Sequence, residues 1–289
     1  MPFRQHRSLR DRSVLAGEAA AAAGAAEAGV DVLPDSRGAA FFDLDNTILR
    51  GAAIFYLARG LYARKLFTVR DIARFGYQQV QFRLGAEDPG HVDSARSAAL
   101  SFIAHRSVAE LKEMAEEIFD DVVRDKVWPG TRAIAQGHLD QGQRVWLVTA
   151  APVEVATIIA KRLGLTGALG TVAEHVEGIY TGRLVGDLLH GPAKAEAVRA
   201  LAVREGLELE SCSAYSDSAN DIPMLSLVGH PCAINPDSAL RAHARQHGWR
   251  IRDYRARRRN TAIGVAAGAG AVGGALGGLA AARRRNRRR

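Results

Sequence analysis

The chain has 289 residues, of which 47% are hydrophobic and 24% charged, as is usual for a soluble globular protein with a sizeable core. Its net charge of +8 does not indicate a nucleic-acid groove, because residues 250–289 hold twelve Arg and one Asp while the middle of the chain is mildly acidic. With only Cys212 and Cys232, the sequence excludes a disulfide framework and favours a reducing compartment.

Residues 1–38 are rich in alanine, with glycines interspersed. Glu18 and Glu27 interrupt the apolar run, so it lacks the continuous hydrophobic region of a secretory signal. We therefore expect residues 1–38 to be a mostly disordered leader with, at most, transient helix.

Four short apolar runs then have the composition of strands that are buried on both faces of a parallel sheet. They are residues 39–42, 145–148, 212–215 and 232–234. Helical patterns lie between several of them, as at 153–163 and 194–205. This alternation predicts an α/β fold with an open, mostly parallel, Rossmann-like sheet. In such sheets ligands bind beyond the carboxyl ends of the strands, and polar residues follow the runs here.

Residues 51–127 have a different pattern, with apolar residues at helical spacing and no convincing strand. A Trp-Pro-Gly sequence at 128–130 marks the return to the sheet. We interpret 51–127 as a helical cap inserted into a core formed by residues 39–50 and 128–252. Residues 178–184 are expected to form a tight hairpin around a glycine-bearing turn.

Acidic residues follow two of the predicted strands. Asp43 and Asp45 end the first, so one carboxylate can attack phosphorus while the other protonates the leaving group and then activates water. Asp217 follows the third strand; with Asp43 and the backbone oxygen of Asp45 it would supply the hard oxygen ligands that Mg²⁺ prefers. Asp221, four residues later on a starting helix, would face the same side and support the metal site.

A phosphate group also needs hydrogen-bond donors and a cation. Thr149 ends the second strand, and its hydroxyl with the following amide, that of Ala150, can donate to phosphate oxygens. Lys194 opens a helix and would place a positive charge against the charge that develops during phosphoryl transfer.

Four segments that hold these residues resemble the motifs of the haloacid dehalogenase superfamily. They are FFDLDNT, VWLVT, HGPAKAEAV and YSDSANDIPML. Their order and spacing are similar to the phosphoserine phosphatase branch, which has a helical cap between the first two motifs. The resemblance covers residues 39–250.

The resemblance implies that Asp43 is the nucleophile and that Asp45 is the general acid and base. It also implies a magnesium cofactor and a small phosphomonoester substrate. The candidate phosphate-binding residues are Thr149, Ala150, Lys194 and Asn220. The candidate metal-binding residues are Asp43, Asp45, Asp217 and Asp221.

Two positions depart from the branch. Phosphoserine phosphatases carry a cap glutamate that reads the serine amino group, whereas residues 50–53 here contain no carboxylate. Ser218 stands where the fourth motif usually has glycine. Phosphoserine is still the leading substrate expectation, and a lipid-linked or lysophospholipid phosphate is the alternative.

The tail, residues 253–289, contains an uncharged segment at 263–282 between arginine clusters. Its length would span a bilayer, but seven of its twenty residues are glycine, so insertion is marginal. One interpretation is a tail that associates with anionic membranes while the catalytic domain faces the cytoplasm. The other is a flexible, soluble tail.

A hypothesis of another class is a non-catalytic scaffold that holds a membrane or nucleic acid through the arginines. The paired Asp43 and Asp45 argue against it, because a scaffold has no need of both. No specific nucleic-acid partner is expected, and the oligomeric state is not predicted.

Overall fold

The computed structural model describes residues 8–27, 37–53, 56–57, 59–60, 100 and 103–255. The chain divides into two compact units, residues 1–251 and 252–289. In the second unit residues 252–255 are described, and Arg255 pairs there with Asp253 (Nε to Oδ1, 3.6 Å). The first unit holds the helices and strands up to Ile251.

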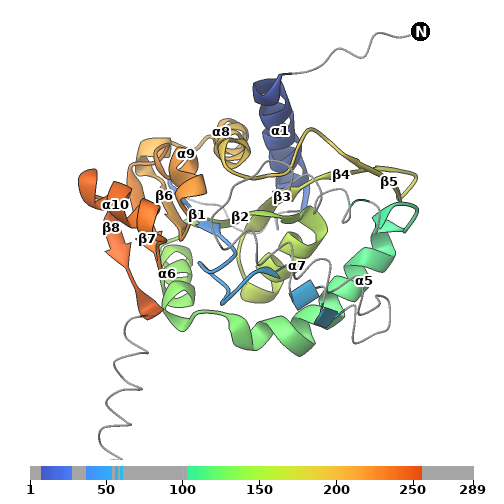
Figure 1. The fold of residues 1–289 in the computed structure, drawn as a ribbon, viewed down its shortest axis with the longest axis horizontal. Coiled ribbons are helices and arrows are strands. Elements are labelled where there is room, and N and C mark those ends of the chain that lie inside the picture. The colour runs from blue at the N-terminus through green and yellow to red at the C-terminus, as the bar shows by residue number, and fades with distance from the viewer. Residues whose placement is uncertain are drawn as a thin grey trace, which may run out of the picture. The chain divides into compact units, whose positions relative to one another are not determined.

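The centre of this unit is a six-stranded sheet in the order β3-β2-β1-β6-β7-β8 (Figure 1). The strands are β1 (Ala39–Asp43), β2 (Arg144–Pro152), β3 (Gly167–Thr171), β6 (Ser213–Ser216), β7 (His230–Ile234) and β8 (Arg250–Arg252). All pairings from β3 to β7 are parallel, so the predicted α/β fold with a mostly parallel sheet is confirmed. The strand β1 lies between β2 and β6, and the carboxyl ends of these three strands meet where parallel sheets bind ligands.

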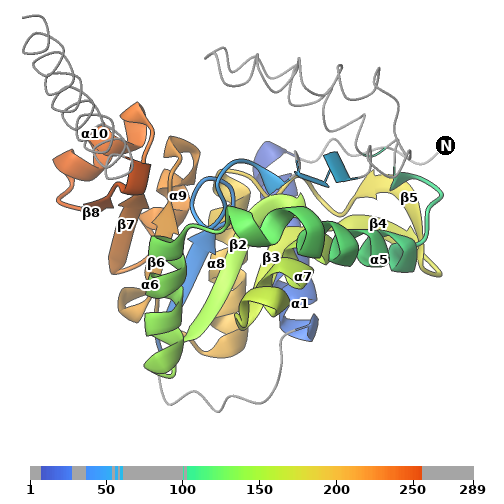
Figure 2. The same cartoon turned by 90° about the horizontal axis from the view of Figure 1, so that it is seen from below.

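Helices cover both faces of the sheet (Figure 2). On one face lie α1 (Leu9–Glu27), α8 (Pro192–Glu205) and the short α9 (Ile222–Leu225). On the other lie α6 (Pro129–Asp140) and α7 (Val153–Leu163). The helix α10 (Ser238–Gln246) follows β7. Asp237 caps its N-terminus, because its side chain accepts the N–H of Leu240. Such a cap satisfies a donor that would otherwise have no partner at the helix start.

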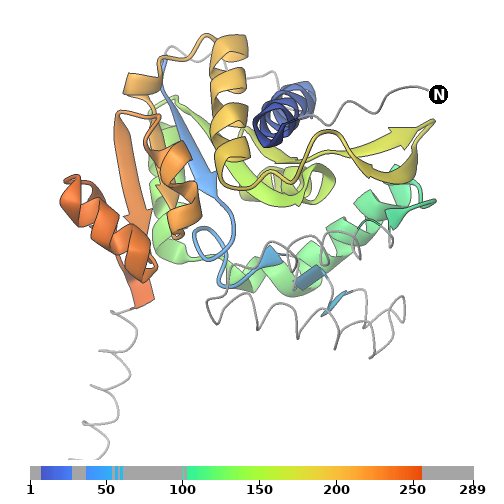
Figure 3. The ribbon, with the colours of Figure 1, turned by 45° about the horizontal axis from the view of Figure 1, so that its top comes forward.

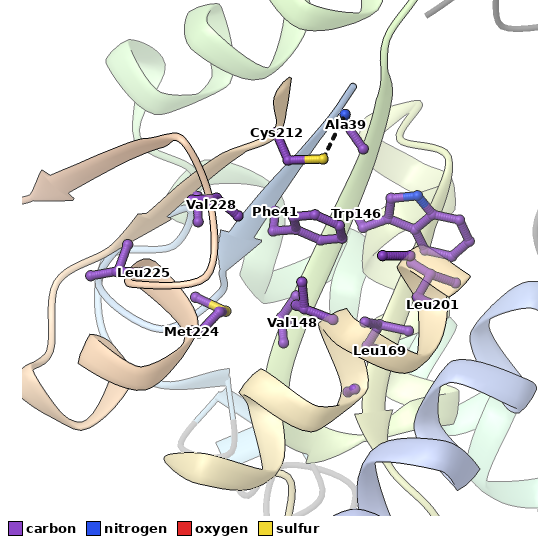
Figure 4. Packing of buried hydrophobic residues seen from close by; sticks show 14 of the residues in the cluster. Ala39, Phe41, Trp146, Val148, Leu169, Leu201, Cys212, Met224, Leu225 and Val228 are labelled. Atoms are coloured by element: carbon purple, nitrogen blue, oxygen red, sulfur yellow. Dashed lines mark hydrogen bonds between the residues drawn. The ribbon is translucent and has the colours of Figure 1, made fainter. Parts of the chain in front are cut away.

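A hydrophobic core lies between the sheet and the helices α1 and α8 (Figure 4). Phe41, Trp146 and Val148 all point to this side, because every second residue of a strand faces the same way. Leu201 of α8 packs against them and is fully buried. The backbone N–H of Ala39 donates to the Sγ of Cys212 (3.3 Å), so this cysteine is an internal structural residue.

Helix α1 differs from the expectation of a disordered leader, which was wrong for residues 9–27. Ala16, Ala20 and Ala21 are buried, and α1 packs against α8 and β3; Figure 3 shows α1 beside α8. The alanine-rich sequence has little contrast between apolar and polar faces, so it gives almost no amphipathic signal. Small side chains nevertheless let the helix approach its neighbours closely, and dispersion contacts then accumulate. The rest of the predicted leader, apart from residues 8 and 37–38, lies outside the described residues.

The predicted cap lies mostly outside the described residues. The chain leaves and re-enters the core side by side, because Leu49 bridges Val127 and the N–H of Arg50 donates to the carbonyl of Lys126 (2.7 Å). Between these points the main described element is α5 (Val108–Ile118). It continues into a π-helical turn (Phe119–Val123) and a 3₁₀ turn (Arg124–Lys126) and packs against α7. The extent of the cap therefore stays a prediction.

The hairpin is formed by β4 (Ala173–Val176) and β5 (Ile179–Leu184), which pair antiparallel. Its two turn residues, Glu177 and Gly178, both have positive φ, as two-residue hairpin turns require. The residues predicted as the hairpin, 178–184, therefore form half of the turn and the whole second strand. The first strand had no recognisable alternation.

None of the helices in the described ranges is long and apolar enough to cross a membrane. The segment predicted to associate with membranes, residues 263–282, lies outside those ranges. Its membrane association stays a prediction.

The core packing predicts unequal effects of two substitutions in the same helix. Leu201 is fully buried and Val203 is 85% exposed, and both belong to α8. We expect Leu201→Ala to lower the free energy of unfolding by about 2–5 kcal/mol, because it leaves a cavity in the core. Val203→Ala should change it by less than about 0.5 kcal/mol. Urea titration followed by circular dichroism measures both, and equal losses would contradict this packing.

Candidate active site

The site begins at the carboxyl end of β1, where Asp43 is the last strand residue and is only 5% exposed. The loop that follows turns back on itself. Asn46 has φ 56°, and its Oδ1 accepts the N–H of Gly51 (3.1 Å). Asp45 is fixed in this loop because its Oδ1 accepts the N–H of Ala53 (2.7 Å). Strand β1 therefore holds the carboxylate of Asp43, and the loop after β1 holds the carboxylate of Asp45.

Thr149, which is buried, lies within β2 because the strand continues to Pro152 instead of ending at Thr149 as predicted. Its Oγ1 accepts the N–H of Ala151 (3.1 Å), which leaves the hydroxyl proton available for donation elsewhere. The carbonyl of Ala150 accepts a hydrogen bond from the hydroxyl of Thr171 in β3 (2.8 Å). A register shift between Val148 and Pro152 lets β2 bend at this point.

Helix α8 brings Lys194 to the same edge. The helix starts after Gly191, whose φ of 53° suits a residue without Cβ, and Pro192 occupies the first turn. The Nζ of Lys194 donates to Asp43 Oδ1 (2.6 Å) and to Asp221 Oδ2 (2.8 Å). The lysine is 4% exposed, so both contacts are shielded from water. One ammonium therefore joins two of the candidate carboxylates.

The loop after β6 carries the fourth motif. Ser216 ends the strand, and its Oγ donates to Asp221 Oδ2 (2.7 Å) while accepting the N–H of Ser218 (3.2 Å). Ser218 has φ −113°, a conformation open to any residue, so glycine is not required at this position. Its Oγ accepts the N–H of Asn220 (3.3 Å), and the carbonyl of Asn220 faces Gly191 at the start of α8. The sequence interpretation missed Ser216, whose only signal is a hydroxyl on the last buried strand residue.

The loop after β7 holds two further residues that the sequence interpretation did not assign. The side-chain amide of Asn235 donates to the carbonyl of Asn46 (3.3 Å), which ties this loop to the one after β1. The N–H of Asp237 donates to the carbonyl of Asp217 (2.8 Å), and its carboxylate accepts the N–H of Ala219 (2.8 Å). Both residues lie within three residues of the end of the fourth predicted strand, which was the available signal.

The electrostatics of the site are dominated by burial. Burial raises the pKa of Asp43 to about 7, although Lys194 opposes this rise. Burial and the charge of Asp43 raise the pKa of Asp217 to about 8. The pKa of Asp45 is also raised by burial, against the N–H of Ala53. Burial alone would lower the pKa of Lys194, but Asp221 and Asp43 raise it above its ordinary value. The carboxylates outnumber the ammonium, so the site favours an additional cation.

This donor set fits Mg²⁺. Among the residues described, no group of three or more His, Cys, Asp or Glu side chains is placed to hold a metal ion. Magnesium does not require one, because it is usually bound by one or two carboxylates and keeps several waters. Asp43 and Asp217 are close enough for Asp43 to raise the pKa of Asp217, and the backbone oxygen of Asp45 lies two residues from Asp43. Asp221 instead binds Lys194 and Ser216, so we expect it to support the metal site without contacting the ion itself.

The chain matches the model of the haloacid dehalogenase-like hydrolase family over residues 40–226. It is 57% identical over 266 residues to phosphoserine phosphatase SerB1 of Mycobacterium tuberculosis H37Rv, which covers 91% of this chain and 86% of that protein. The structure also resembles that of a Bordetella pertussis protein of unknown function (TM-score 0.67, 30% identity), over 75% of this chain and 99% of that one.

A phospho-aspartyl intermediate analogue of phosphoserine phosphatase shares the fold, with a TM-score of 0.51 and 21% identity over 76% of this chain and 97% of that one. The four motifs lie within the residues that match the family model, and the order of the strands agrees with the same fold. The chain belongs to the haloacid dehalogenase-like hydrolase family, and it is therefore a hydrolytic enzyme. The family resemblance that the four motifs indicated is confirmed.

The buried hydroxyl of Ser216 predicts a measurable stability effect. In Ser216→Ala the Asp221 carboxylate loses a donor and the N–H of Ser218 loses its acceptor. We expect the free energy of unfolding to fall by about 1–3 kcal/mol, because the buried Asp221 carboxylate keeps only Lys194 as a donor and the N–H of Ser218 loses its acceptor. Ser226→Ala removes an exposed hydroxyl and serves as the matched control. Urea titration of both variants checks this, and equal stabilities would show that the hydroxyl contributes nothing.

Proposed function

We propose that this protein is a magnesium-dependent phosphomonoester hydrolase that forms a phospho-aspartate on Asp43. The observation that carries the proposal is the buried ammonium of Lys194 between Asp43 and Asp221, with Asp45 two residues from Asp43. A nucleophile, an acid and a cation for phosphate oxygens then lie at one edge of the sheet. These are the parts that phosphoryl transfer requires.

The contacts give the two carboxylate oxygens of Asp43 different roles. Oδ1 is bound by Lys194, so Oδ2 is the oxygen that attacks phosphorus. As the phosphorus–oxygen ester bond breaks, Asp45 gives its proton to the leaving alkoxide. A raised pKa suits Asp45 to hold that proton near neutral pH. In the second step Asp45 takes a proton from water, which attacks phosphorus, releases inorganic phosphate and restores the Asp43 carboxylate.

The remaining residues bind and orient the phosphoryl group. The hydroxyl of Thr149 and the N–H of Ala150 would donate to its oxygens, as would Lys194. Asp43, Asp217 and the backbone oxygen of Asp45 would hold Mg²⁺. When bound, the ion supplies positive charge to the phosphoryl oxygens and to the buried carboxylates. Asp221 fixes the position of Lys194.

Phosphoserine is the substrate we favour, supported by the identity with a relative named phosphoserine phosphatase. Residues 50–53 contain no carboxylate that could bind its amino group, so another group must do so. A lipid-linked phosphate would depend on the tail beyond the described residues. We therefore keep phosphoserine, a small soluble ester, as the first candidate.

Phosphate release from a panel of phosphomonoesters headed by phosphoserine tests the activity. We expect turnover with Mg²⁺, none with EDTA, and a loss of at least about a thousandfold in Asp43→Asn, because removing a nucleophile removes the covalent route. Asp140→Asn, at an exposed position on α6, is the matched control and should keep full activity.

The ranking of the panel identifies the substrate class. Turnover that persists in Asp43→Asn would contradict the covalent mechanism. Absence of turnover on every soluble ester and on lipid phosphates in liposomes would overturn the phosphomonoesterase proposal.

The raised pKa values predict how the stability of the metal-free protein depends on pH. Asp43 and Asp217 have folded pKa values of about 7 and about 8, against 3.8 for an unshifted aspartate. Between these limits the folded protein keeps protons that the unfolded chain has released. The free energy of unfolding in EDTA should therefore fall as the pH rises from about 5 to about 8.

Added Mg²⁺ should reverse this loss, and it should stabilise the protein more at about pH 8 than at about pH 5, because its ligands must be deprotonated. Urea titrations at the two pH values, with EDTA and with Mg²⁺, measure the effect. Equal stabilisation by Mg²⁺ at both pH values would mean that these carboxylates do not hold the ion.

A further inference from the structure

Helix α1 contacts the part of the structure that carries Lys194. It packs against α8 along much of its length, and Figure 3 shows the two helices side by side. Ala16, Gly17 and Ala20 lie on the buried side, while Glu18 is exposed. The helix therefore presents a face of small residues to α8, which brings the two backbones close together.

The two backbones approach each other closely at Gly17. A Cβ on this residue would lie 2.7 Å from the backbone nitrogen of Ala197 and 2.8 Å from the carbonyl carbon of Glu196. Real Cβ atoms do not approach backbone atoms so closely, so any side chain here must push the two helices apart. Ala197 and Glu196 lie within one helical turn of Lys194, so this contact sets the position of the turn that carries the lysine.

A second contact holds the segment just before α8. Residues 185–191, which we call the strap, connect β5 to α8. Gly186 of the strap has φ 86°, and a Cβ there would lie 2.5 Å from the nitrogen of Ala16. Asp187 pairs with Arg12 of α1 (Oδ2 to NH2, 3.5 Å). The chain therefore passes over α1 immediately before it reaches Lys194.

Lys194 needs this support because its two contacts require the side chain to be placed accurately. Its Nζ lies 2.6 Å from Asp43 and 2.8 Å from Asp221, and both acceptors belong to other segments. Movement of the first turn of α8 by a fraction of an ångström would lengthen both contacts. Hydrogen bonds between charged groups are short and need good alignment, so displacement of the lysine weakens both of them.

We propose that α1 is a positioning element for the active site, which holds Lys194 against Asp43 through Gly17 and through the strap. The catalytic consequence rests on the proposed phosphatase function, in which Lys194 binds phosphate oxygens. The alanine-rich N-terminal helix then acts on substrate binding although it supplies no group to the reaction.

Two glycines of α1 offer a matched pair of variants. Gly17→Ala presses on α8 beside Lys194. Gly24→Ala presses on β3 instead, because its Cβ would lie 2.5 Å from the carbonyl oxygen of Ala168. Both add one methyl group against backbone, so both should lower stability. Only the first should disturb the lysine.

The kinetic readout separates positioning from simple destabilisation. At a temperature where circular dichroism shows each variant folded, Gly17→Ala should raise the KM and the inhibition constant of inorganic phosphate. Its kcat/KM should fall about tenfold to a hundredfold, as displacements of this size do. Gly24→Ala should keep the wild-type KM and inhibition constant. Equal values in the two variants would overturn the proposal.

A second readout does not need activity. Reductive methylation with formaldehyde and borohydride, followed by peptide mass spectrometry, reports how accessible each lysine is. Lys194 should react much more slowly than exposed Lys161 in the wild type and in Gly24→Ala. In Gly17→Ala the protection of Lys194 should be lost. If the wild type proves inactive, the phosphatase proposal fails, while this labelling still tests the role of α1.

Arg12→Gln tests the proposal if Gly17→Ala does not fold. The Arg12–Asp187 pair is partly exposed, with 39% and 22% of the two side chains accessible, so its loss leaves the protein folded. We expect faster methylation of Lys194 and a higher KM in this variant. Wild-type values of both would overturn the proposal.

Discussion

The buried ammonium of Lys194 joins three segments that are far apart in the sequence. Asp43 comes from β1, Lys194 from α8 and Asp221 from the turn after β6, and the two contacts measure 2.6 and 2.8 Å. A buried charge is tolerated only when it is paired and hydrogen-bonded. The fold must therefore bring these segments together accurately, and the parallel sheet does so by aligning the carboxyl ends of β1, β2 and β6.

The same cluster supports the proposal that the site holds a divalent ion. One ammonium cannot neutralise Asp43, Asp45, Asp217 and Asp221, and burial makes each unpaired negative charge expensive. The raised pKa values of Asp43 and Asp217 express this deficit of positive charge. A cation that prefers oxygen ligands removes it, and a phosphoryl group would bring further oxygens to the same charges. The structure of the site and its proposed chemistry thus depend on the same balance between the carboxylates and the positive charges that face them.

Much of the fold was predictable because its signals are local. Continuous apolar runs marked β1, β2, β6 and β7, and polar residues after them marked the edge that holds the candidate site. Strand β3 was missed because its sequence, GALGT, consists mostly of small residues with weak strand preference. Helix α1 was misread because alanine and glycine give no amphipathic contrast, and only its contacts with α8 and β3 reveal its place.

The site was predictable in part for a similar reason. Asp43, Asp45, Asp217 and Lys194 stand in motifs whose spacing can be read directly. Ser216 was missed because a serine at a strand end is common, and its bond to Asp221 depends on the folded turn. The contact from Asn235 to Asn46 spans 189 residues, and no local pattern encodes such a pairing.

Trapping of the covalent intermediate tests the central claim most directly. The full chain would be mixed with its best phosphomonoester and Mg²⁺, quenched, and treated with borohydride, which reduces an aspartyl phosphate to homoserine. Peptide mass spectrometry then locates the change. The proposed mechanism predicts homoserine at position 43 and nowhere else, and none without substrate. Homoserine at another aspartate, or an unmodified Asp43 during steady turnover, would contradict it.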